Sequence, residues 1–162
     1  MSIIKRVSIY DLDGTIICSL HRYRTIVGSD GVTRIDLPYW RANEHRAMDD
    51  SLRPLASLYR EDIADPNTYV VIATARVLHR PDREFIRTRL GMPNHLISRP
   101  DGFEGSGAHM KVSGLERLFS RMPHLLRAAD VSFYEDNRSY LAAVTTRFPS
   151  IRGVFVPSTQ GH

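Results

Sequence analysis

Two aspartates one residue apart, at the end of a short apolar stretch, constrain this chain more than any other feature. Residues 7–10 (Val-Ser-Ile-Tyr) are typical of a buried strand, and Asp11-Leu12-Asp13-Gly14-Thr15 follows directly. Residues i and i+2 of a strand point to the same side, so we expect Asp11 and Asp13 to reach one ligand together. Two crowded carboxylates repel each other unless a cation or a proton lies between them, and hard oxygen ligands suit magnesium.

The residues after the aspartates indicate a tight turn. Gly14 permits a sharp bend with close backbone approach, and we expect the Thr15 hydroxyl to bond a free amide there. A simple Asp-Gly turn that only closes the strand is the alternative interpretation. Residues later in the chain favour the functional one.

Strand-like and helix-like segments alternate along the 162 residues. This alternation predicts one α/β domain, residues 1–162, with a three-layer Rossmann-like parallel sheet and helices on both faces. Apolar runs predict further strands at residues 69–73, 95–98, 131–134 and 153–157. Helices are predicted from Ser51, from Pro81, from Lys111 and over residues 138–148.

Residues 16–50 interrupt the alternation. Two β-rich runs, 25–27 and 32–35, joined by Gly-Ser-Asp-Gly, predict a hairpin that forms a small flap or cap over Asp11 and Asp13. Tyr39 and Trp40 follow it. Such aromatic residues beside arginines can contact a nucleobase, but anchoring of the insertion to the core is the favoured interpretation.

Polar residues also follow the later predicted strands, at positions where they could share a site with Asp11 and Asp13. Thr74 comes directly after residues 69–73, and Arg76 can add a charge-assisted contact to phosphate. Lys111 follows a glycine-rich stretch, residues 99–110, which we expect to be a mobile loop. Glu135 and Asp136 end the strand at 131–134, and an acidic helix amino terminus is the rival interpretation for Glu135.

Taken in order, Asp11 to Thr15, Thr74, Lys111 and Glu135-Asp136 resemble the four motifs of the haloacid dehalogenase-like (HAD) phosphohydrolase superfamily. The resemblance covers nearly the whole chain and implies a sheet with the first strand at its centre. It also implies that motif residues meet at the carboxyl edge of that sheet, where open α/β folds bind ligands.

The resemblance implies a role for each motif residue. Asp11 is expected to attack phosphorus and form an aspartyl-phosphate, and Asp13 to act as general acid and base. Mg²⁺ is expected to be held by Asp11, by the main-chain carbonyl of Asp13 and by Asp136. Thr74 and Lys111 are expected to hold the phosphoryl oxygens. Glu135 is either a further metal ligand or the residue that orients Lys111 or a water. We expect Gly14, Thr15 and Arg76 to contact the substrate.

The architecture is most similar to the phosphatase domain of bacteriophage polynucleotide kinase/phosphatases, and no phosphate-cradling loop of a kinase is present. This resemblance predicts a phosphatase that acts on a nucleotide or a polynucleotide 3′ end. A small-metabolite phosphatase and a catalytically silent binding module are the alternatives.

Composition bounds the partners. The net charge of +4 and the pI of about 9.5 favour anionic substrates, including nucleic-acid ends. Because the first strand is predicted within a few residues of the amino terminus, we expect no signal peptide, and the single cysteine, Cys18, favours a reducing, cytoplasmic compartment. No apolar run is long enough to predict a membrane span, and we expect no obligate protein partner.

Overall fold

A five-stranded parallel sheet forms the centre of the computed structural model, which describes residues 3–159. The strand order is β7-β6-β1-β8-β9, and every neighbouring pair is parallel. Strand β1 is therefore central, as predicted. The strands are β1 (Arg6–Tyr10), β6 (Thr68–Ala73), β7 (His95–Ile97), β8 (Asp130–Glu135) and β9 (Arg152–Phe155).

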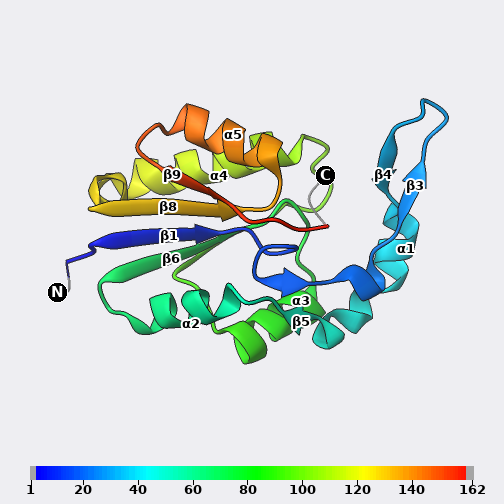
Figure 1. Ribbon diagram of the computed structural model, residues 1–162, viewed down its shortest axis with the longest axis horizontal. Coiled ribbons are helices and arrows are strands. Elements are labelled where there is room, and N and C mark those ends of the chain that lie inside the picture. The colour runs from blue at the N-terminus through cyan, green and yellow to red at the C-terminus, as the bar shows by residue number, and fades with distance from the viewer. Residues whose placement is uncertain (1–2, 160–162) are drawn as a thin grey trace.

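Helices cover both faces of this sheet (Figure 1). One face carries α2 (Ala56–Ala64) and α3 (Arg80–Phe85), the latter continued by one π-helical turn, Ile86–Leu90. The other face carries α4 (Gly107–Arg121), α5 (Arg138–Arg147) and a 3₁₀ turn, Pro123–Arg127. The predicted three-layer α/β class is confirmed. Across residues 3–159, every helix is too short or too polar to cross a membrane.

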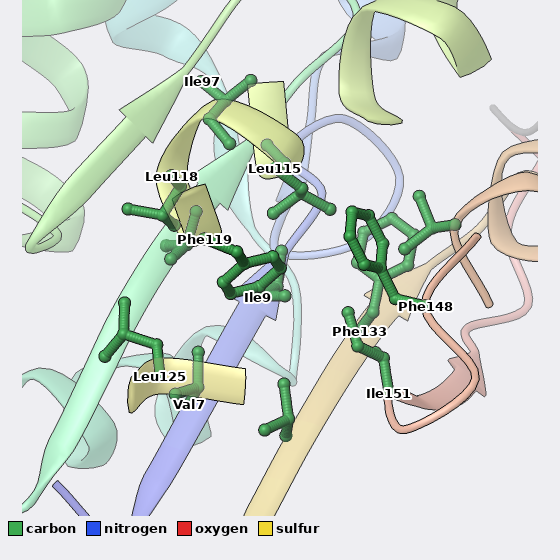
Figure 2. Packing of buried hydrophobic residues seen from close by; sticks show 14 of the residues in the cluster. Val7, Ile9, Ile97, Leu115, Leu118, Phe119, Leu125, Phe133, Phe148 and Ile151 are labelled. Atoms are coloured by element: carbon green, nitrogen blue, oxygen red, sulfur yellow. The ribbon is translucent and has the colours of Figure 1, made fainter. Parts of the chain in front are cut away.

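Alternate residues of β1 enter the two cores, as the two-residue period of a strand requires. Val7 and Ile9 pack with α4 and α5, whereas Tyr10 packs with α2 and α3. Figure 2 shows the first of these cores, where Phe119 and Phe148 meet edge to face with their ring centroids 5.3 Å apart. Both faces of the central strand are thus fully buried, which fixes the position of the aspartates that follow it.

The insertion after β1 is built from short elements. Strand β2 (Ile17–Cys18) pairs with β5 (Ser51–Leu52), and the hairpin consists of β3 (Thr25–Val27) and β4 (Thr33–Ile35). The remaining elements are α1 (Leu37–Ala42) and two 3₁₀ turns, Leu20–Arg22 and Glu44–Asp49. The predicted hairpin is confirmed, but its predicted position is not. Figure 1 shows the hairpin projecting beyond the sheet. Ser19, in the segment that precedes the hairpin, contacts Asp13.

Two predicted helix starts are wrong. Ser51 lies in β5, and α2 begins only at Ala56, because residues 51 and 52 satisfy their backbone by pairing with β2. Helix α4 begins at Gly107, four residues before Lys111, because the Ser106 side chain caps its amino terminus by accepting a hydrogen bond from the His109 amide.

Candidate active site

The predicted site residues gather at the carboxyl edge of the sheet. Asp11 follows β1, Thr74 follows β6, and Glu135 and Asp136 lie at the end of β8. Because Tyr10 is in register with both Ile72 and Tyr134, the residues after these three strands emerge side by side. The superfamily resemblance implied this arrangement, with the first strand central and the motif residues at the carboxyl edge of the sheet.

Lys111 connects two of these carboxylates. Its side chain is fully buried, and Nζ lies 2.6 Å from Asp11 Oδ1 and 2.5 Å from Glu135 Oε2. Burial alone would lower the pKa of Lys111, but the two carboxylates outweigh it and raise that pKa above its ordinary value. The ammonium is therefore a fixed positive charge against Asp11. Lys111 lies four residues inside α4, one turn away from the helix amino terminus, where a positive charge would be unfavourable.

Asp11 is held on both oxygens. Oδ2 accepts a hydrogen bond from the Thr15 hydroxyl at 3.1 Å, while Oδ1 contacts Lys111. The Thr15 hydroxyl was expected to bond a backbone amide; instead it orients the carboxylate. Burial first, and then the negative charge of Glu135, raise the pKa of Asp11 to about 7 despite the Lys111 ammonium.

Asp136 carries the group that best indicates a cation. Its Oδ2 is buried and accepts no hydrogen bond from the part of the chain that the structure describes. Burial and the nearby Asp11 raise the pKa of Asp136 to about 6. Oxygens of Asp11, Glu135 and Asp136 all lie within 4.8 Å of one another. Three carboxylates and the one ammonium of Lys111 leave two negative charges, which a divalent cation would neutralise.

Glu135 already has partners for both of its oxygens. Oε2 contacts Lys111, and Oε1 accepts the Asn137 amide at 3.0 Å. Its contact with Lys111 supports the orienting role that the sequence also allowed, and a direct role in metal binding stays a prediction. Gly14 adopts φ +80°, and a Cβ there would overlap the Asp136 carboxylate, so the predicted close backbone approach is present.

Asp13 has a different environment from Asp11. Its Oδ1 accepts a hydrogen bond from the Ser19 hydroxyl at 2.7 Å, and Oδ2 lies 2.7 Å from Arg76 Nε. Arg76 was expected to contact substrate phosphate, yet in this structure it is paired with Asp13 and with Asp82 (2.6 Å). The structure therefore supports Arg76 as a partner of Asp13 more than as a ligand of the substrate phosphate.

Two further residues of the site carried no sequence pattern. Ser19 binds Asp13. The Ser158 hydroxyl lies next to Gly14, and its hydrogen bond to Asp136 partly offsets the rise in the pKa of that carboxyl group. Both lie in irregular segments, where neither period nor motif marks a residue. Thr74 is buried directly after β6, where its amide donates to the Ile97 carbonyl of β7 at 2.9 Å.

Magnesium is expected to raise the melting temperature more at about pH 8 than at about pH 6. The folded-state pKa values of Asp11 and Asp136, about 7 and about 6, exceed the ordinary value of 3.8, so the metal-free fold binds extra protons and loses stability as pH rises from about 4 to 7. Magnesium must displace those protons. Thermal melts with and without millimolar magnesium at both pH values measure this, and a shift that is equal or larger at the lower pH would contradict it.

Comparison with known proteins finds a family match over the first 100 residues of the chain. The family model of the bacteriophage T5 5′-deoxynucleotidase matches residues 1–100. The 5′-deoxynucleotidase of Escherichia phage T5 is 40% identical over 87 residues, which are 52% of this chain and 35% of that protein. The chain thus spans about a third of the length of the curated relative that it matches.

Solved structures share the fold. A chain of the Pnkp1/Rnl/Hen1 RNA repair complex superposes with a TM-score of 0.63 at 17% identity, over 97% of this chain and 44% of that one. CbbY from Rhodobacter sphaeroides, solved in complex with phosphate, gives 0.61 at 16% identity, over 99% and 89%. The haloacid dehalogenase-like protein SP0104 from Streptococcus pneumoniae gives 0.60 at 11%, over 94% and 87%. The predicted HAD-like fold is confirmed.

Proposed function

The chain belongs to the bacteriophage T5 5′-deoxynucleotidase family, and we propose that it is a phosphatase that hydrolyses 5′-deoxynucleoside monophosphates. The main structural support for the proposal is the contact of the Lys111 ammonium with both Asp11 and Glu135. The first 100 residues of the chain match that family. Residues 1–100 contain Asp11, Asp13 and Thr74. Lys111, Glu135 and Asp136 lie beyond the match, so their place in the site is supported by the fold alone.

In the proposed reaction Asp11 is the nucleophile. Its carboxylate attacks phosphorus, the bond from phosphorus to the 5′ oxygen breaks, and Asp13 gives a proton to that oxygen. Asp13 then takes a proton from the water that hydrolyses the aspartyl-phosphate, which restores both carboxyl groups. The Thr15 hydroxyl holds Asp11 in place for the attack.

Positive charge is needed because negative charge gathers on the phosphoryl oxygens as they transfer. Lys111 supplies one fixed charge beside Asp11. Residues Asp11 and Asp136, with the main-chain carbonyl of Asp13, would hold a magnesium ion, which supplies further charge neutralisation when bound. Thr74 is proposed to donate its hydroxyl to a phosphoryl oxygen, and Gly14 permits the backbone to approach the substrate.

A polynucleotide 3′-phosphate is the second candidate substrate. The hairpin projects beyond the sheet, and within residues 3–159 the insertion consists only of short elements, which suits a large substrate (Figure 1). The basic charge of the chain also favours a polyanion. This remains a prediction from the sequence, as does the small-metabolite alternative.

Phosphate release from three substrates in parallel tests the proposal. The substrates are a set of 5′-deoxynucleoside monophosphates, a 3′-phosphorylated oligonucleotide and a sugar phosphate, each assayed with magnesium and with a chelator. We expect magnesium-dependent release from the deoxynucleotides. Preference for the oligonucleotide would replace the proposed substrate by the second candidate, and no release from any of them would support the silent binding module.

A further inference from the structure

A buried network of charges joins the insertion to Asp13. Arg22 is fully buried, and it donates two hydrogen bonds to Asp50, from Nε to Oδ1 (2.8 Å) and from Nη2 to Oδ2 (2.6 Å). Nη2 also donates to Asp82 Oδ1 at 3.1 Å. Arg22 and Asp50 belong to the insertion, whereas Asp82 belongs to α3, so this cluster fastens the insertion to the body of the domain.

Arg76 extends the cluster to the site. Its Nη1 donates to Asp82 Oδ1, the same oxygen that Arg22 uses, at 2.6 Å. Its Nε lies 2.7 Å from Asp13 Oδ2. Both guanidinium groups also lie over the Trp40 ring, Arg22 at 4.4 Å and Arg76 at 5.2 Å from the centroid. The position of Arg76 against Asp13 therefore depends on Arg22 and Trp40.

Stability alone does not explain this network. Replacing buried ion pairs by packed apolar groups is often neutral or stabilising, because the charges lose their hydration. Nη1 of Arg22 has no hydrogen-bond partner within residues 3–159, which adds to that cost. Such a network is weak evidence for stability, and one that ends on the proposed general acid is better explained by the residue that it positions.

We propose that Arg22 and Arg76 are positioning residues that fix the orientation of the Asp13 carboxyl group for its proton transfers to the leaving group and from water. Arg76 restrains one oxygen of Asp13 and Ser19 the other, while 22% of the Asp13 side chain stays exposed to an incoming substrate. Arg22 acts only through Asp82, Trp40 and Arg76. This inference rests on the proposed function, in which Asp13 gives its proton to the 5′ oxygen as the bond to phosphorus breaks.

The dependence of the rate on the leaving group tests it. A nucleoside 5′ oxygen needs a proton to leave, whereas 2,4-dinitrophenolate leaves without one. We expect Arg22→Lys and Arg22→Gln to lower kcat/KM for a 5′-deoxynucleotide about 10²-fold and for 2,4-dinitrophenyl phosphate only about two-fold. The parameter kcat/KM is chosen because it reports the first phosphoryl transfer and not the later hydrolysis of the aspartyl-phosphate.

Arg24 provides the matched control. It pairs with Asp36 and lies 4.4 Å over the Tyr39 ring in the same insertion, and within residues 3–159 its guanidinium forms no ion pair with Asp13 or Asp82. Arg24→Gln should leave both substrates unaffected. Asp50→Asn, which loosens Arg22 while keeping it, should reproduce the selective loss if the Arg22 variants fold poorly.

The outcomes are distinct. A selective loss on the deoxynucleotide supports positioning of Asp13. An equal loss on both substrates, or no loss, in folded Arg22 and Asp50 variants would overturn the inference and leave a structural role. If the unmodified protein hydrolyses neither substrate, the proposed function itself fails.

Discussion

Asp11→Asn is expected to lower phosphate release by at least about 10³-fold, because the variant has no nucleophile to form the aspartyl-phosphate. The fold should survive. Burial and Glu135 raise the pKa of Asp11 to about 7, which means that its ionised form is disfavoured in the metal-free protein. A neutral amide removes that unfavourable charge, so the melting temperature without magnesium at about pH 8 should be unchanged or higher.

Asp62→Asn is the control for loss of a buried carboxylate. Asp62 lies in α2, where it accepts the Tyr10 hydroxyl at 2.6 Å and pairs with Arg6 at the start of β1. This variant should lose stability and keep its turnover. Assays of phosphate release and thermal melts of both variants measure the two effects separately, and substantial turnover by Asp11→Asn would refute the nucleophile assignment.

Lys111→Met is expected to lose both activity and stability. It removes the positive charge beside Asp11 and leaves Asp11, Glu135 and Asp136 buried without a compensating cation. Removing one partner of a buried ion pair costs about 3–5 kcal/mol, which lowers the melting temperature by about 10 °C in a domain of this size. Phosphate release should fall at least about 10²-fold.

The second lysine of the chain, Lys5, gives the matched control, because it is exposed and lies before β1. Lys5→Met should change neither property. Adding Glu135→Gln to Lys111→Met removes one uncompensated charge and should recover part of the lost stability without recovering activity. If Lys111→Met melts at the temperature of the unmodified protein, the contacts of Lys111 with Asp11 and Glu135 do not stabilise the fold.

The regular part of the fold was predictable because its physical causes are local. Strands buried on both faces are continuous apolar runs, and parallel strands place their carboxyl ends at one edge. Asp11 and Lys111 are 100 residues apart, yet their proximity followed from the superfamily resemblance. The hairpin at residues 25–35 followed from its turn residues.

The irregular part was not predictable, because its contacts are non-local and lie outside any period. Strands β2 and β5 have two residues each, too few to show alternation. The link between Arg22 and Asp82 crosses 60 residues and joins a 3₁₀ turn to α3. Trp40 was favoured as an anchor of the insertion, and the sequence could not show that its ring lies beside Arg22 and Arg76.

Trapping the aspartyl-phosphate tests most directly whether the phosphoryl group is transferred to Asp11. The protein is mixed with magnesium and a 5′-deoxynucleotide labelled in its phosphate, quenched in acid within one turnover, and digested for mass spectrometry. We expect labelled phosphate on the peptide that contains Asp11. Hydroxylamine should remove this label, and the Asp11→Asn variant should not carry it. Turnover of the nucleotide with no label on that peptide, or with label on another residue, would contradict the account.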